Sequence, residues 1–493
     1  MTEENATQPS ANQGISWKQG LLIAMGVPIL IVPSLADISY TLYAMSILIW
    51  VISVVSGFFL NLNLGEMCAT FRTPGIAGSI QYMFTDDEKY KGKKINTGRL
   101  LSAVGAWCYF NPWITVVPIF TIMAAEYIFT LVPDFFGGID YWTKIGFYLL
   151  IGLAMYAFII FSGRKGLEGG AKVQLILTIF TIVPIVVICI APLVMGHFHL
   201  DYVVNEMTPP GWAWDGNGIL MILGCLTVAQ WSAVGWETAA AYGAEYKDPS
   251  HDVPKALMSC GLACLALYFL IGFCMYGTLG GDYIYNSVDA GTSTYILKPI
   301  ADMCFGTYGG IIAVVCLIIG MVMVVQTAFL GASMTIKAMA EEGSLPYLFA
   351  DTNEYGVPMK AMYFEAFIGV VLIISGATAS QILAVCAFSY CVCHAMCQLA
   401  FIKSRRDPRF KDVERVYKVP TALYYSSFVV IGFEIALMIG IMYYLYMIYD
   451  ITYALMGPLF AVLYIPCWMI FQWWNSKHHP ELPCGMDFGQ AKE

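Results

Sequence analysis

Long runs of apolar residues follow one another along almost the whole chain, and short polar segments separate them. Each run holds roughly 20 or more mostly apolar residues, enough for an α-helix to cross a bilayer core about 30 Å thick. The polar segments between the runs are too short to form a soluble domain. The pattern predicts an all-α polytopic membrane protein with twelve transmembrane segments, at 18–38, 41–66, 102–131, 142–162, 172–196, 217–243, 256–279, 307–336, 361–378, 381–402, 421–446 and 450–474.

Segments one and six each contain residues that interrupt a helix. Segment one carries Gly26, Pro28 and Pro33 inside its apolar run, and segment six carries the stretch 232–235. Proline lacks an N–H and clashes with the preceding turn, and glycine weakens a helix by about 1 kcal/mol relative to alanine. Backbone groups freed in this way need a partner from protein, water or ligand within the membrane. Ordinary helix kinks are the alternative interpretation.

The two interruptions lie five segments apart, which suggests two five-helix repeats that each open with a broken helix. In secondary transporters such paired interruptions mark the binding site. The predicted organisation is a cytoplasmic N-terminal tail at 1–17, a first inverted repeat at 18–196, a second at 217–402, two further helices at 421–474 and a cytoplasmic C-terminal tail at 475–493.

The basic residues are distributed unevenly between the two sides of the predicted membrane. If the N-terminus is cytoplasmic, the clusters at 89–99 and 403–418 lie inside, and only Lys144 and Lys298 fall outside. This asymmetry agrees with the positive-inside rule and predicts that both termini are cytoplasmic. The first thirteen residues are polar and acidic, unlike a secretory signal peptide. We expect a multi-pass protein of the plasma membrane, or of the inner membrane in a bacterium.

Composition narrows the possible partners. Of the 493 residues 59% are hydrophobic and 12% charged, whereas soluble proteins are roughly half apolar and a quarter charged. The formal net charge of −9 counts against nucleic acid, so the lipid bilayer is the expected surroundings. Most of the fifteen cysteines lie in apolar segments, where cysteine packs as a small hydrophobe. The densest group, around His394, does not share one helix face, so we expect no metal site, no disulfide framework and no cofactor.

Glu237 is the residue of the sequence whose position in an apolar run most clearly needs a chemical explanation. A carboxylate in mid-membrane costs a few kcal/mol, roughly, unless it is neutral, paired or hydrated, so it indicates a functional site. It is interpreted as a proton-binding or gate-coupling group, or alternatively as a protonated carboxyl that bonds freed backbone. Asn111, Gln326 and Thr327 are mid-membrane polar residues that either line a site or form interhelical hydrogen bonds. Glu365 and Glu434 remain unexplained.

The stretch from Trp231 to Ala256 resembles the sixth-segment signature of the amino acid–polyamine–organocation transporters. Further stretches at 65–82, 163–184, 337–346, 356–361 and 416–420 are similar to that family as well. The resemblance implies a LeuT-like core of five plus five inverted helices, followed by two more. The matching positions of the signature are Trp231, Gly235, Glu237, Ala239, Glu245, Pro249, Pro254 and Ala256.

The resemblance also implies how the two breaks bind a substrate. At the first break the family usually has Gly-Ser-Gly-Ile-Phe, whose N–H groups hold a carboxylate at a positive helix end. Here residues 26–30 are Gly-Val-Pro-Ile-Leu, so Pro28 removes a donor, and the N–H groups of Gly26, Val27 and Ile29 remain. Capture of a carboxylate should be weaker or displaced, which makes an amine substrate more credible.

At the second break, carbonyls around Trp231, Ser232 and Ala233 are expected to accept hydrogen bonds from a substrate ammonium group, with Gly235 in the same break. By resemblance Trp231 is a lid over the substrate, where cation–π attraction contributes about 0.5–2 kcal/mol; a packing role is the alternative. Proton-coupled relatives often carry a lysine where this chain has Thr181. Arginine/agmatine exchangers have a tryptophan where Ala328 stands, which argues against guanidinium substrates.

These features predict a secondary transporter that moves an amino acid or related amine by alternating access. Exchange is favoured over proton symport, and sodium coupling remains open. A polyamine, monoamine or amino-acid/decarboxylation-product antiporter is the nearest alternative. A channel would need a continuous polar lining, and a membrane-embedded enzyme would need a nucleophile–base or metal constellation. The six histidines provide no such constellation, so we do not expect an enzyme.

Overall fold

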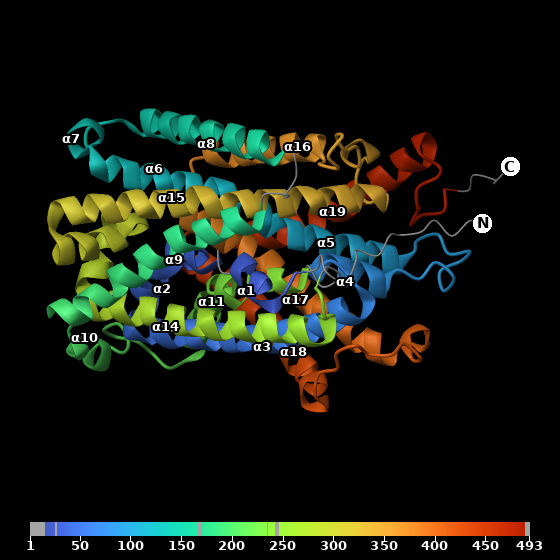
Figure 1. The fold of residues 1–493 in the computed structure, drawn as a ribbon, viewed down its shortest axis with the longest axis horizontal. Coiled ribbons are helices and arrows are strands. Elements are labelled where there is room, and N and C mark those ends of the chain that lie inside the picture. The colour runs from blue at the N-terminus through green and yellow to red at the C-terminus, as the bar shows by residue number, and fades with distance from the viewer. Residues whose placement is uncertain (1–14, 25–26, 165–169, 234, 242–245, 489–493) are drawn as a thin grey trace.

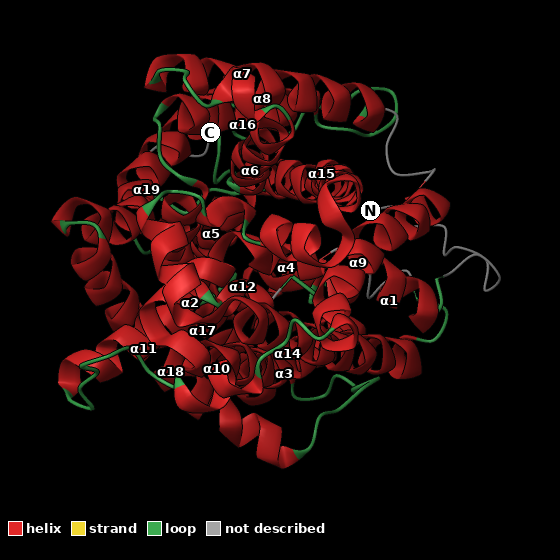
Figure 2. Cartoon of the chain, turned by 90° about the vertical axis from the view of Figure 1, so that its left-hand side faces the viewer, coloured by secondary structure: helices red, strands yellow, loops and turns green. Residues whose placement is uncertain are grey.

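The computed structural model describes residues 15–488, except 25–26, 165–169, 234 and 242–245. Its described regular elements are all helices, and no strand occurs among them beyond two isolated bridges. Figure 1 shows the long helices running side by side along the length of the molecule, and Figure 2 shows the bundle from one end. This arrangement is that of a multi-pass membrane protein.

Eight helical stretches in the described part of the chain are long and apolar enough to cross a membrane, and a shorter apolar helix covers Ile182–Met195. The eight stretches are Ile31–Phe71, Thr97–Leu131, Tyr141–Gly163, Pro249–Asp289, Leu297–Glu341, Ala379–Arg406, Thr421–Ile448 and Ile451–His478. The polytopic helical fold is therefore confirmed, whereas the number of twelve segments and the internal repeat stay predictions.

The helices of the first half follow the predicted segments in order. Segment one is divided into α1 (Trp17–Ala24), the 3₁₀ helix η1 (Val27–Ser34) and α2 (Leu35–Leu42). After η2 (Tyr43–Met45) come α3 (Ser46–Phe71), α4 (Gly75–Phe84), α5 (Thr97–Ile114), α6 (Val116–Leu131), α7 (Pro133–Phe136), α8 (Tyr141–Gly163), α9 (Gly170–Met195) and α10 (Leu200–Asn205).

The second half also begins with a divided segment, which long helices follow. Segment six consists of α11 (Gly216–Val228), α12 (Gln230–Ala233) and α13 (Thr238–Ala241). The remaining elements are α14 (Pro249–Asp289), η4 (Ser293–Tyr295), α15 (Leu297–Glu341), η5 (Tyr347–Phe349), α16 (Met359–Ile374), α17 (Ala379–Arg406), η6 (Pro408–Phe410), α18 (Thr421–Ile448) and α19 (Ile451–His478).

Two of these helices are longer than the predicted segments and are bent by glycine. Gly280 in α14 has φ +73° and Gly306 in α15 has φ +66°, values that favour glycine because it has no Cβ. The predicted segments end at 279 and begin at 307, next to these bends. The apolar pattern therefore located most of the straight part of each helix. The additional turns lie beyond the bends and also at the opposite ends, at 249–255 and 337–341.

The core of the molecule lies between the helices, and apolar residues also cover the outside. The interior includes the fully buried rings of Trp50, Trp236 and Trp468. On the outer helices large apolar side chains are exposed, such as Phe161 of α8 at 65% and Val429 of α18 at 72%. Exposed apolar side chains on every outer helix are expected where the surrounding solvent is lipid.

Candidate functional site

The break in segment six is a tight turn between two short helices. The described backbone resumes at Gly235 with φ +93°, and the N–H of Thr238 donates to the carbonyl oxygen of Gly235 at 3.3 Å. The Thr238 hydroxyl donates to the same oxygen at 2.8 Å. A positive φ is accessible to glycine without a steric penalty, so this residue type permits the turn. Segment six is thus interrupted at the position that its sequence indicates.

The side chain of Glu237 closes this turn from within. One carboxylate oxygen accepts a hydrogen bond from the N–H of Gly235, and the other accepts one from the Tyr109 hydroxyl of α5 at 3.3 Å. Glu237 is only 1% exposed. The carboxylate therefore satisfies backbone freed by the break and connects segment six to segment three. Both interpretations of this residue, coupling group and partner for backbone, are compatible with these contacts.

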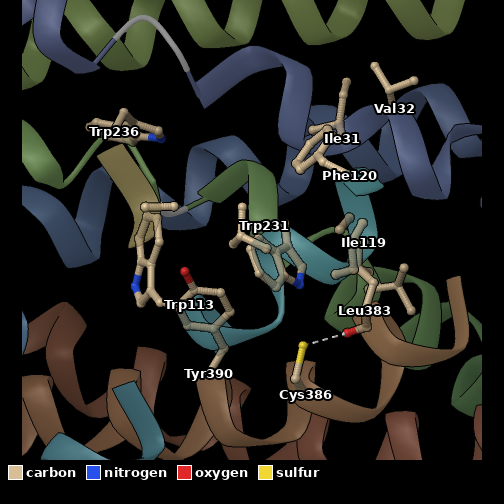
Figure 3. Packing of buried hydrophobic residues seen from close by; sticks show 14 of the residues in the cluster. Ile31, Val32, Trp113, Ile119, Phe120, Trp231, Trp236, Leu383, Cys386 and Tyr390 are labelled. Carbon is tan, nitrogen blue, oxygen red and sulfur yellow. Dashed lines mark hydrogen bonds between the residues drawn. The ribbon is translucent and has the colours of Figure 1, made fainter. Parts of the chain in front are cut away.

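Trp231 lies on α12, in the interior of the bundle. Its ring meets Tyr390 of α17 edge to face, with 5.0 Å between the ring centroids (Figure 3). Its indole nitrogen has no hydrogen-bond partner within the described part of the chain, although the residue is 2% exposed. A buried indole N–H normally finds a partner, so this donor is available to a ligand.

Trp236 has a different environment from Trp231. Its ring packs on Phe58 of α3 at 5.3 Å between centroids, and its indole N–H donates to the carbonyl oxygen of Ser232 at 3.2 Å. The Ser232 carbonyl, which the sequence assigns to a substrate ammonium group, already has this partner. The Ser232 hydroxyl donates to the carbonyl of Ala229, which also accepts from Ser53 of α3. The break is held mainly by side chains of its own neighbourhood.

The two interrupted segments touch each other at their breaks. The 3₁₀ helix η1 contacts α12, and it also contacts α17. The Ser380 hydroxyl of α17 donates to the Pro33 carbonyl of η1 at 3.2 Å, which satisfies one backbone group near the proline. Val27, Pro28 and Ile29 belong to η1, whereas Gly26 lies outside the described residues. The chain thus brings together the two stretches that the sequence selected.

The remaining predicted polar residues have separate positions. Asn111 of α5 donates to the Ser389 hydroxyl of α17 at 2.8 Å. Gln326 of α15 donates to the Ser162 hydroxyl of α8 at 3.2 Å, which makes an interhelical hydrogen bond. Thr327 follows it on α15, and Thr181 is part of α9. Asn111 therefore connects α5 to α17, two helices beside the breaks, whereas Gln326 connects α15 to α8.

Tyr109 and Tyr390 were not singled out by sequence, yet they contact Glu237 and Trp231. Tyrosine is common in membrane helices, and neither residue stands in an interrupted stretch. Only the packing of α5 and α17 against the breaks distinguishes them. The described residues contain no group of three His, Cys, Asp or Glu side chains that could hold a metal ion.

A cavity lies away from the breaks, at the end of the bundle where α3, α4 and η6 meet. It has a volume of about 530 Å³ and is lined by residues that include Arg72, Arg409 and Glu342. Beside it Arg99 donates to both oxygens of Asp87 at 2.7 Å, and this holds the pKa of the Asp87 carboxyl below its usual range. The cavity therefore lies next to ion pairs at this end of the bundle and is not part of the breaks.

Glu66 is the centre of a second ionic group at the same end. This carboxylate of α3 is fully buried and accepts hydrogen bonds from Arg405, from Arg415 and, at 2.8 Å, from the N–H of Val419. Burial, with the nearby Glu66 charge, raises the pKa of Tyr417 to about 12. The basic loop between α17 and α18 is thus fastened to α3.

A bundle of helices long and apolar enough to cross a membrane, with two interrupted segments in contact, is the architecture of a multi-pass membrane protein. The family model for amino acid permeases matches residues 15–471. The chain belongs to this family.

Several curated transporters are similar to this chain. The serine/threonine exchanger SteT of Bacillus subtilis is 25% identical over 320 residues, which cover 64% of this chain and 68% of SteT. The amino-acid permease GAP3 of Candida albicans is 24% identical over 341 residues, 66% of this chain and 51% of GAP3. An arginine/ornithine antiporter of Latilactobacillus sakei is 28% identical over 209 residues, 41% of this chain and 42% of the antiporter. The chain therefore spans about half or less of the last two relatives.

Proposed function

We propose that this protein is a secondary transporter that moves an amino acid or a closely related amine across the plasma membrane by alternating access. Exchange of one solute for another is its favoured mode. The observation that carries the proposal is the contact between η1 and α12, the two broken stretches, next to the buried Glu237. Backbone groups at such breaks bind the charged ends of a zwitterion or an amine.

The relatives support the exchange mode. SteT is a serine/threonine exchanger, and two further relatives are arginine/ornithine antiporters. The chain lacks a lysine at position 181, so coupling through an amine at that position is not available. Protonation at Glu237 and sodium coupling are the alternatives to exchange.

In this proposal the two inverted repeats occupy 18–196 and 217–402, both termini are cytoplasmic, and the substrate lies between the breaks. The N–H groups of Val27 and Ile29 face its carboxylate, if it has one. The indole N–H of Trp231 lacks a protein partner among the described residues and is the group best placed to contact the ligand. Asn111, bonded to Ser389, is expected to set the spacing of α5 and α17 beside the site.

An amine without a carboxylate is the second candidate substrate, because Pro28 lacks the N–H that a carboxylate would use. The two candidates differ only at the first break. The amino acid reading requires the carboxylate to be held by fewer N–H donors than the family usually provides.

Uptake into proteoliposomes tests the proposal. Radiolabelled amino acids and amines are offered with and without an internal counter-substrate, and with pH or sodium gradients. We expect uptake of at least one amino acid or amine that increases strongly when counter-substrate is inside. No flux for any of these solutes, or flux that ignores both counter-substrate and gradients, would contradict the proposal. Empty liposomes measure the leak.

A further inference from the structure

His394 of α17 is a buried histidine for which the proposed function provides no role. It is 0% exposed, and neither ring nitrogen makes a hydrogen bond within the described part of the chain. The nearest opposite charge is Glu434 of α18, whose Oε1 lies 3.6 Å from His394 Nδ1. Glu434 is 2% exposed, and its other oxygen likewise has no hydrogen bond among the described residues.

A second carboxylate interacts with the histidine. Glu237, in the break of segment six, is close enough to His394 for the two to interact electrostatically. His394 also stacks on Tyr390, with 5.1 Å between ring centroids and 26° between planes. Tyr390 in turn packs against Trp231, and Figure 3 shows these two rings. A continuous series of side chains therefore connects Glu434 on α18 to the break.

The other titratable groups around His394 are thiols and phenols. Cys391 faces Glu434, Cys393 interacts with both Glu237 and Glu434, and Tyr109 bonds Glu237. Cys108 of α5 and Cys397 of α17 adjoin Cys393. Thiols and phenols stay neutral in an apolar interior, because burial disfavours their charged forms. The groups of this cluster that can carry a proton or a charge are therefore the carboxyls of Glu237 and Glu434 and the imidazole of His394.

The count of protons on these three groups determines the charge of the interior. Two protons shared among two carboxyls and one imidazole leave the group with no net charge. Loss of one proton leaves one negative charge in the membrane interior, which is unfavourable unless a cation is nearby. A substrate ammonium group at the break of segment six would be that cation.

We propose that His394 and Glu434 form a proton-binding site that is linked through Tyr390 and Glu237 to the substrate break. It deepens the proposed function, because it rests on a substrate with an ammonium group binding there. Substrate arrival favours the ionised form of Glu237, and a proton leaves the three-residue group. Removal of the substrate reverses this step, so proton release accompanies substrate binding, and transport depends on pH.

Infrared difference spectroscopy of the protein in lipid, between about pH 5 and pH 8, tests the site without any substrate. We expect a carboxylic C=O band that disappears in Glu434→Gln and whose midpoint moves by about one pH unit or more in His394→Gln. Glu365→Gln is the matched control, because Glu365 is fully buried but bonded to Ser333 at 2.7 Å. No band assignable to Glu434, or an unchanged midpoint in His394→Gln, overturns the inference. An unchanged midpoint in His394→Gln would instead indicate that a bridging water separates His394 from Glu434.

Transport provides the second measurement. Homoexchange at equal pH on both sides should change by about tenfold across two pH units in the wild type and by less than about twofold in His394→Gln. His251→Gln, an exposed histidine, should follow the wild type. A pH-dependent band without any transport would contradict the proposed function and leave the proton site standing. Exchange with the same pH profile in wild type and His394→Gln would overturn the proton site alone.

Discussion

Glu237 reaches back along its own chain to the N–H of Gly235, and Tyr109 donates to its second oxygen. A carboxylate in this position has two roles. It satisfies backbone that the break leaves free, and it is a group that gains and loses a proton. A substitution that keeps the shape and removes the proton separates the two tasks.

Glu237→Gln retains an oxygen that accepts from the Gly235 N–H but cannot titrate. We expect uptake to persist while its dependence on pH is lost or flattened, measured in proteoliposomes across about pH 5 to 8. Glu365→Gln, in another buried carboxyl, should keep the wild-type profile. Unchanged kinetics of Glu237→Gln at every pH would assign the residue to structure.

At the scale of the element, the two broken segments differ in what holds them. The break of segment six is maintained by a glycine with positive φ and by the Glu237 carboxylate, which accepts from the Gly235 N–H. The side chains of Thr238 and Trp236 donate further hydrogen bonds to backbone carbonyls there. The break of segment one follows from proline, and the Pro33 carbonyl is satisfied by Ser380 of α17. The break of segment six therefore depends mainly on its own residues, whereas the break of segment one depends on a neighbouring helix.

Gly235→Ala tests the turn of segment six. A Cβ at φ +93° strains the backbone, which costs about 1–3 kcal/mol, so we expect a lower melting temperature and reduced transport. Gly432→Ala in α18 is the control, because a Cβ there meets open space and alanine favours a helix. A melting temperature for Gly235→Ala equal to that of the wild type would show that the turn adapts.

Pro28→Gly tests the break of segment one. The change restores an N–H at the position where the family usually has a donor for the substrate carboxylate. We expect the apparent affinity for amino acids to improve by several-fold, roughly the effect of one hydrogen bond, while the affinity for amines without a carboxylate stays the same. Competition uptake with matched amino acid and amine pairs measures both. Equal changes for the two classes would refute a role of the missing donor.

At the scale of the whole molecule, one end of the bundle is fastened by buried and partly exposed ion pairs. Glu66 on α3 binds Arg405 of α17 and Arg415 of the following loop, and Arg99 of α5 binds Asp87 and Glu342. Apart from the local Arg99–Asp87 pair, these contacts join residues that are more than 200 positions apart in the chain. They restrict the relative movement of α3, α5, α15 and α17 at that end.

Glu66→Gln leaves the guanidinium groups of Arg405 and Arg415 without a carboxylate in a largely buried site. Removal of one partner from a buried pair costs about 3–5 kcal/mol, so we expect a marked drop of the melting temperature in detergent. Glu354→Gln, on an exposed loop, should not change it. If both variants melt as the wild type does, the pairs contribute little to stability.

The sequence alone predicted the helical membrane class, the order of the elements and the positions of both breaks. These follow from local chemistry: apolar runs long enough for a bilayer, proline without an N–H, and glycine at the turn. The number of twelve segments, the inverted repeat and the role of each site residue stay predictions. Glu237 was recognised because an acidic residue within an apolar run is visible in the sequence alone.

The tertiary structure decided which side chains meet. The sequence drew attention to His394 only through the cysteines around it and to Glu434 only as an unexplained acid, and nothing in the local pattern of α17 distinguishes Tyr390. Only the packing of α17 and α18 against the break places Tyr390 on Trp231 and His394 beside Glu434. A single sequence shows which residues are apolar, polar or conformationally permissive, because these are properties of one residue and its neighbours. Contacts between helices depend on how distant parts of the chain pack, and only the folded chain contains them.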